Sequence, residues 1–302
     1  MIAQAGPAAG SPAEAGALTI ADLSVELHGE FCPPFDQWPD SYRPFLSMGS
    51  RGRGAVRFLP GDEAVRPSDD GFRSTYQAGA WQAGRHADRP VYRFHAGENR
   101  PYLWAAPRDR FDAVDIWLAE EGGRQMPPLL HPVDRVLFMG ILAHRAGLIV
   151  HSCGWLCNGR ALLFPGVSGA GKTTLCRQLM ASGHGAVLSD DRMVLRDGDG
   201  TIRAYGTPWP GDAKQARNES APLAGLCFIE KADGPRLIPI RPAEAFRRLL
   251  EAASIPWYDA GLRDHVLPVV ERLVSSVPAY RLGFRPDPEV VEILLPLTEG
   301  GG

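Results

Sequence analysis

The chain has 302 residues, of which 44% are hydrophobic, and a formal net charge of −3 at pH 7. This composition is typical of a globular protein, and the nearly balanced charge excludes the basic field expected of a nucleic-acid-binding protein or of one held on anionic membranes. No apolar run approaches the roughly 18 residues needed to span a bilayer, and the five cysteines are scattered, so we expect a cytoplasmic protein with free thiols and with neither nucleic acid nor membrane as a partner.

The N-terminal part of the chain predicts a disordered tail followed by a small β-rich domain. Residues 1–17 are rich in Ala, Gly and Pro and lack the basic start and apolar stretch of a signal peptide. From 18 to 128, short apolar or alternating runs are separated by Gly, Pro, Asp and Asn, a pattern typical of strands. The clearest runs are 18–27, 55–59, 90–94 and 102–105, and one helix is expected near 113–121. This domain contains no motif with recognisable chemistry.

A second domain, 129–302, is predicted to begin with a helix and a hairpin. His131-Pro132 opens the helix, whose apolar face consists of Val133, Val136, Leu137, Gly140 and Ile141. After residue 147 the pattern changes to a strand, and Asn158-Gly159 predicts a type I′ turn that folds this strand back on the next one. If these two residues form the turn, counting outward from it places His151 opposite Gly166.

Residues 161–174 form an apolar strand that runs directly into the pattern G-x-x-x-x-G-K-T. In such a loop, backbone N–H groups and the N-terminus of the following helix bind phosphate oxygens. Lys172 supplies a positive charge for the β- and γ-phosphates, and the Thr173 hydroxyl is placed to ligate Mg²⁺. We therefore predict that the chain binds ATP with Mg²⁺. The predicted nucleotide-binding residues are Gly166, Ser168, Gly169, Ala170, Gly171, Lys172, Thr173 and Thr174.

Two adjacent carboxylates are predicted to return to the edge of the sheet where the phosphates bind. A helix of about eleven residues spans roughly 16 Å, and the strand that follows covers a similar distance before it reaches Asp190 and Asp191. The right-handed crossover rule makes the strands before and after the helix close neighbours. Beside a magnesium-bound nucleotide, one acid can hold the metal and the other can accept the proton of an attacking hydroxyl.

His151 is interpreted as a hydrogen-bonding group near the phosphates because the hairpin places it at the mouth of the loop. Two alternatives stay open at this point. The imidazole could merely cap a buried strand, and a zinc site of His151, Cys153 and Cys157 would lack a fourth ligand at a familiar spacing.

The order of these features resembles the catalytic domain of the HPr kinase/phosphorylase family, whose fold is related to that of the ATP-dependent phosphoenolpyruvate carboxykinases. His151 precedes the loop, and the segment Ser189-Asp190-Asp191-Arg192 begins its acidic pair eighteen residues after the lysine. Residues 205–211 are similar to a loop of divergent HPr-kinase-like proteins, some of which occur beside peptide natural-product genes. The resemblance covers about 129–282 and implies an α/β fold with a P-loop kinase domain.

This resemblance also implies roles for individual residues. Asp190 would be the base that takes the proton of a seryl hydroxyl, and Asp191 would assist near the metal, with Thr173 as the other magnesium ligand. His151 would be a hydrogen-bonding group on the phosphate side, and Lys172 would hold the phosphate. The set of predicted catalytic residues is therefore Asp190, Asp191, His151 and Lys172.

The predicted function is the transfer of the γ-phosphoryl group of ATP to a Ser or Thr hydroxyl of a peptide or protein. A small-molecule kinase, a carboxykinase-like metabolic enzyme and a nucleotide-binding regulatory module without turnover are alternatives, and a homo-oligomer is left open. Arg192, Arg217 and Arg241 are interpreted as solvated surface side chains. Trp209, between two prolines, either covers the bound substrates or packs into the core.

Overall fold

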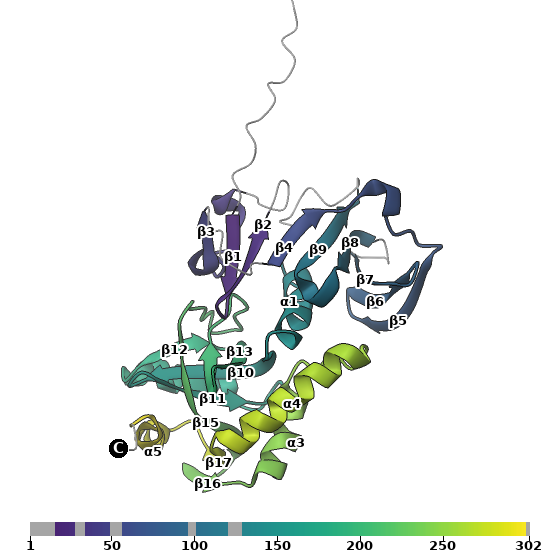
Figure 1. Ribbon diagram of the computed structural model, residues 1–302. Coiled ribbons are helices and arrows are strands. Elements are labelled where there is room, and N and C mark those ends of the chain that lie inside the picture. Colours follow the sequence, from purple (N-terminus) through teal and green to yellow (C-terminus); the bar gives the residue numbers. More distant parts are fainter. Residues whose placement is uncertain (1–15, 28–33, 49–55, 96–100, 120–128, 300–302) are drawn as a thin grey trace, which may run out of the picture.

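The computed structural model describes residues 16–27, 34–48, 56–95, 101–119 and 129–299. Within these ranges the chain forms two β-sheets, one from the N-terminal and one from the C-terminal part of the sequence (Figure 1). Most of the predicted N-terminal tail, 1–15, lies outside the described residues. Gly16 and Ala17, which were also assigned to the tail, belong to the first strand. No helix in the described ranges has the length and the apolar character needed to cross a membrane.

The N-terminal sheet has nine strands in the order β3-β1-β2-β4-β9-β8-β7-β6-β5. They are β1 (Gly16–Ile20), β2 (Leu23–Leu27), β3 (Leu46–Met48), β4 (Val56–Pro60), β5 (Phe72–Ala78), β6 (Trp81–His86), β7 (Arg89–His95), β8 (Pro101–Pro107) and β9 (Ala113–Leu118). The predicted strand runs therefore fall on strands, and the run 18–27 divides into two strands at a turn whose residues Ala21 and Asp22 have positive φ.

The helix expected near 113–121 is wrong over 113–118, which form strand β9. This segment pairs with β4 on one side and with β8 on the other, and its interior is buried on both faces. The acidic residue inside it, Asp115, accepts hydrogen bonds from Arg89 and Arg108. Pairing with distant strands therefore decides its conformation, and the local pattern does not reveal this pairing.

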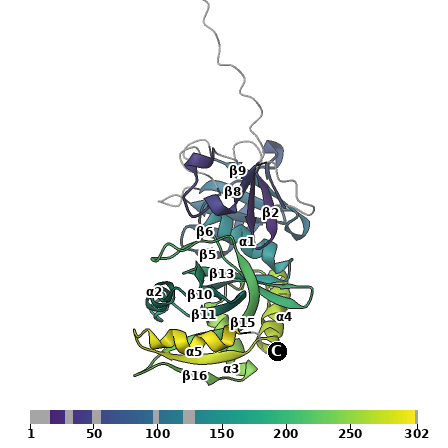
Figure 2. The same cartoon turned by 90° about the vertical axis from the view of Figure 1, so that its left-hand side faces the viewer.

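The C-terminal part combines the second sheet with five helices, which Figure 2 shows around the strands. Its elements are α1 (Val133–Ala143), β10 (Gly147–Cys157), β11 (Arg160–Pro165), α2 (Lys172–Ser182), β12 (Ala186–Ser189), β13 (Arg192–Gly198), β14 (Thr201–Tyr205), β15 (Ser220–Lys231), β16 (Arg236–Pro239), α3 (Pro242–Ala252), α4 (Ala260–Ser276), β17 (Ala279–Phe284) and α5 (Glu289–Thr298). The predicted apolar face of α1 is buried along its whole length.

The predicted hairpin register is confirmed. β10 and β11 pair antiparallel from Cys157↔Arg160 to Ser152↔Pro165, and both turn residues, Asn158 and Gly159, have positive φ as a type I′ turn requires. One step beyond the ladder, the Gly166 N–H donates to the His151 carbonyl over 3.1 Å. The first residue of the glycine-rich loop is thus fixed beside His151 by main-chain contacts.

The long strand β10 places the aspartate pair. Its first half pairs with β13, up to His151↔Arg192, and its second half pairs with β12, beginning at Gly154↔Ser189. The aspartates occupy the short link between those two partners. On its other edge β10 pairs with β11, so β11 and β12 are separated by β10 and do not pair with each other. The returning chain reaches the expected edge of the sheet, although one strand farther across than adjacent pairing would place it.

The two parts of the chain share one hydrophobic core. The cluster that contains α1, α3 and α4 continues into the N-terminal sheet, whereas α2 and α5 belong to a second cluster with β11 and β17. Asp134 on α1 links distant segments, because its carboxylate accepts hydrogen bonds from the Tyr42 hydroxyl and the Trp209 indole, both at 2.6 Å. Trp209 is only 5% exposed. It therefore takes the packing role that was one of its two predicted alternatives.

Candidate active site

The glycine-rich loop, residues 166–171, connects β11 to the first turn of α2. Gly169 and Gly171 have φ values of +82° and +101°, a region that side chains with a Cβ disfavour. These two conformations turn the chain so that α2 begins at Lys172, with Gly171 as its N-cap. The tip of the loop, 167–169, is exposed. The loop therefore brings an accessible backbone to the N-terminus of a helix, which is the arrangement that binds phosphate oxygens.

The Lys172 side chain folds back over this loop. Its ammonium group donates to the carbonyls of Gly166 and Val167 at 2.7 and 2.9 Å, and the residue is only 6% exposed. Burial lowers the pKa of Lys172, while the nearby carboxylate of Asp191 acts in the opposite direction. The positive charge is therefore held at the loop and close to one member of the aspartate pair.

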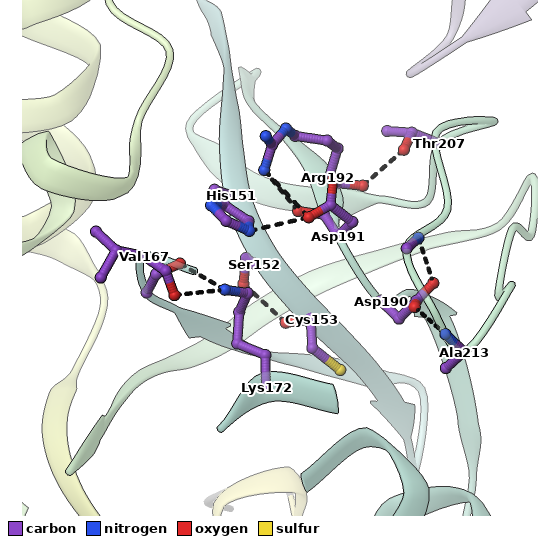
Figure 3. A network of polar contacts seen from close by, with 12 residues as sticks. His151, Ser152, Cys153, Val167, Lys172, Asp190, Asp191, Arg192, Thr207 and Ala213 are labelled. Carbon is purple, nitrogen blue, oxygen red and sulfur yellow. Dashed lines mark hydrogen bonds and ion pairs between the residues drawn. The ribbon is translucent and has the colours of Figure 1, made fainter. Parts of the chain in front are cut away.

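His151 and Asp191 meet across the link between β12 and β13 (Figure 3). The imidazole Nε2 donates to Asp191 Oδ1 over 2.9 Å, and the Arg192 guanidinium lies 3.3 Å from the same oxygen. The Ser152 N–H also donates to the Asp191 carbonyl, which fixes the backbone at this point. Among the described residues, no hydrogen-bond donor contacts the second carboxylate oxygen, Oδ2. One oxygen of Asp191 is thus held by the protein, and the other is left for a ligand.

The electrostatics of Asp191 favour its charged form. Burial on its own would raise the pKa of this carboxyl group, but the hydrogen bond from His151 and the charges of Arg192 and Lys172 lower it below its ordinary value. Asp191 is consequently ionised at neutral pH. Its negative charge lies among positive groups that are also suited to contact phosphate.

Asp190 is placed differently from the position that the sequence analysis predicts. Its carboxylate accepts backbone N–H bonds from Gly211, Ala213 and Gln215 at 3.0, 2.7 and 3.0 Å. Asp190 is only 3% exposed, and Figure 3 shows it pointing away from the group formed by His151 and Asp191. Successive residues of an extended chain point to opposite sides, so only one of the two aspartates can face the loop. The geometry gives that position to Asp191 and a loop-holding role to Asp190.

Three basic residues beside Asp191 were not predicted as part of the site. Arg192 pairs with His151 through the β10–β13 ladder, and the charges of Arg192, Arg135 and Asp191 all act on the imidazole of His131. Burial, followed by the charges of Arg135 and Arg192, lowers the pKa of His131 to about 4. The adjacency of Arg192 to the aspartates was the available signal, but its placement depends on a strand pairing that the sequence does not display.

The side chains at the loop fit a magnesium-bound nucleotide. Thr173 and Thr174 lie in the first turn of α2 and are half-buried. Within the described ranges, no group of three or more His, Cys, Asp or Glu residues could hold a metal ion by itself. Mg²⁺ at nucleotide sites is usually bound through one or two protein oxygens together with phosphates and water, and the Thr173 hydroxyl and Asp191 Oδ2 are oxygens of this kind.

Comparison with known protein families places the chain. Residues 129–285 match the family described as SynChlorMet cassette protein ScmC, and this span is more than half of the chain. The chain belongs to this family. No curated protein matches it. The span shared with the ScmC family runs from just before α1 to just after β17 and contains every residue of the candidate site, whereas the nine-stranded sheet lies outside it.

Proposed function

We propose that the chain is an ATP-dependent kinase with a P-loop domain of the HPr kinase and phosphoenolpyruvate carboxykinase type. On this proposal it transfers the γ-phosphoryl group to a Ser or Thr hydroxyl of a peptide or protein. The observation that supports it best is the meeting of three groups from three segments: the Lys172 ammonium on the glycine-rich loop, the Asp191 carboxylate after β12, and the His151 imidazole on β10.

In the proposed reaction the loop amides and Lys172 bind the β- and γ-phosphates of ATP. Magnesium, held by Thr173 and Asp191, would neutralise charge on the phosphates. The acceptor hydroxyl attacks the γ-phosphorus, its oxygen forms the new bond, and the bond between that phosphorus and the leaving ADP oxygen breaks. The hydroxyl proton passes to Asp191 Oδ2, while His151 and Arg192 hold the opposite oxygen of the same carboxylate. Alignment and charge neutralisation provide most of the catalysis in such a transfer.

This assignment moves the proton-accepting role from Asp190 to Asp191. Asp190 already accepts three main-chain hydrogen bonds, so it has little capacity left for a substrate hydroxyl. Asp191 has an oxygen without a protein donor, and its charge is stabilised next to the loop. The low pKa of Asp191 makes it a weak base, which suits a phosphoryl transfer in which the proton leaves late.

The test is the transfer of label from γ-labelled ATP to peptides encoded beside the gene. We expect Mg²⁺-dependent labelling of a Ser or Thr residue by the wild type, and a loss of at least 100-fold in Asp191→Asn, the magnitude typical of an acid–base group. Asp199→Asn is the matched control, because Asp199 lies in the exposed β13–β14 turn and has a positive φ that Asn tolerates. Nucleotide binding without labelling of any acceptor would favour the regulatory module, and labelling of a metabolite alone would favour the small-molecule kinase.

A further inference from the structure

A second feature of the molecule is a cleft of about 270 Å³ between the N-terminal sheet and the C-terminal part. It is lined by Tyr76 and Trp81 from the sheet, Arg135 from α1, Arg192 from β13, and Trp257 and Tyr258 from the segment between α3 and α4. Because the N-terminal sheet lies outside the span shared with the ScmC family, this cleft combines a family element with one that the family match does not cover.

The cleft adjoins the candidate active site through Arg192. The guanidinium of this residue contacts Asp191 Oδ1, and the same side chain lines the cleft. A molecule that fills the cleft therefore lies beside the carboxylate to which we assign the acceptor proton. This position is suited to the acceptor and not to the nucleotide, whose phosphates are expected at the loop.

The charge in the cleft favours an anionic group. Among the described residues no carboxylate lies within ion-pair distance of the Arg135 guanidinium, although Asp134 and Asp191 influence it from farther away. Burial lowers the pKa of Arg135, and the positive charge of Arg192 lowers it further. Two neighbouring guanidinium groups repel each other, and a carboxylate between them relieves that repulsion and suits their planar geometry.

The other wall of the cleft is aromatic and partly exposed. Tyr76 packs against Tyr258 and Trp81, with ring centroids 5.1 and 5.3 Å apart. Trp257 is 57% exposed, an unusual degree for so large an apolar side chain. Exposed Trp and Tyr next to Arg form the combination that is enriched at sites where proteins bind other chains.

The position of Tyr76 indicates that the occupant is a peptide. Tyr76 belongs to β5, which is the last strand of the nine-stranded sheet and lies beside the segment that leads into α4 (Figure 1). The outer edge of such a strand presents main-chain N–H and C=O groups to which an extended peptide can bind. A small metabolite would use the arginines but would leave this edge and Trp257 unused.

We propose that this cleft binds the acceptor and that the acceptor is an acidic peptide, with a carboxylate between Arg135 and Arg192 and an apolar or aromatic side chain against Tyr76 and Trp257. This inference rests on the proposed function in naming the bound peptide as the acceptor. The binding site itself can be tested without nucleotide.

The experiment measures the binding of two synthetic serine peptides that differ only in Glu or Gln beside the serine, each with a Phe two residues away. We expect the wild type to bind the Glu peptide at least tenfold more tightly than the Gln peptide. Arg135→Gln should abolish this preference, and Trp257→Ala should weaken both peptides equally. Arg217→Gln, which changes an exposed arginine paired with Glu219, is the matched control and should behave as wild type.

Equal or absent binding of the two peptides by the wild type would overturn the proposal, as would a preference that survives Arg135→Gln. The near-ultraviolet circular dichroism of each variant shows that it has folded, and Trp257→Ala, at an exposed position, provides a second test if Arg135→Gln does not fold. Selective binding of the Glu peptide without any phosphoryl transfer would contradict the proposed kinase and leave the peptide site standing.

Discussion

The two adjacent aspartates should respond to substitution in opposite ways. Asp190→Ala removes the acceptor of three main-chain hydrogen bonds in a buried position. Hydrogen bonds to a charged group contribute about 1.5–3 kcal/mol each, and water can reach the half-buried amides of 211–215 after the change. We therefore expect the free energy of unfolding to fall by about 3–5 kcal/mol, a large share of the total stability of a typical domain.

Asp191→Ala should change stability far less. Its partners are His151 and Arg192, whose side chains remain in contact with solvent, and partly exposed ion pairs contribute about 0–1 kcal/mol. We expect this variant to unfold within about 1 kcal/mol of the wild type and to bind Mg·ATP, but to transfer no phosphoryl group.

The assay combines urea unfolding followed by circular dichroism with nucleotide titration on the same preparations. Both variants are compared with Asp199→Asn, whose stability should match that of the wild type. The reasoning is refuted if Asp190→Ala is as stable as the wild type and alone loses transfer, because Asp190 would then be the base predicted from the sequence. It is also refuted if Asp191→Ala retains transfer.

Three further predictions concern pH, the loop and the core. Burial raises the pKa of Asp134 from 3.8 to about 6, so this residue stabilises the fold below pH 4 and that contribution, about 3 kcal/mol, is lost as pH rises to 6; the difference in unfolding free energy between wild type and Asp134→Asn, measured across this range, should show the slope, whereas a constant difference contradicts it, and the subtraction removes the opposite contribution of His131. Gly169→Ala and Gly183→Ala should each cost about 1 kcal/mol of stability, because both glycines have positive φ and open space around a Cβ, but only Gly169→Ala should weaken ATP binding; equal ATP affinity in the two variants would count against the loop. Trp209→Phe removes a hydrogen bond to the buried Asp134 carboxylate and should destabilise the protein by about 2 kcal/mol in thermal unfolding, an effect that would be absent if the indole did not hold that carboxylate.

The features that the sequence predicted well are those that depend on residues close together in the chain. The turn at Asn158-Gly159 set the register of β10 with β11, and this register placed His151 beside Gly166 before any coordinates were considered. The strand runs of the N-terminal part and the buried face of α1 were likewise visible as local patterns. In each case the signal lies within about a dozen residues.

The features that the sequence did not predict depend on contacts between distant segments. Whether Asp190 or Asp191 faces the loop is decided by the pairing of β10 with both β12 and β13, which fixes the direction of each side chain. The segment around Asp115 is a strand because β4 and β8 flank it. Arg135 joins the site only because α1 packs against β10, so a residue that looks like surface on a helical wheel lines a cleft.

The central claim is that Lys172 and the glycine-rich loop bind the phosphates of ATP beside Asp191. Calorimetric titration of Mg·ATP into the wild type and into Lys172→Ala tests it most directly, because it requires no knowledge of the acceptor. We expect one binding site in the wild type and an affinity at least tenfold weaker in Lys172→Ala, with both proteins folded. Absence of binding in the wild type, or equal affinity in the two proteins, would contradict the account.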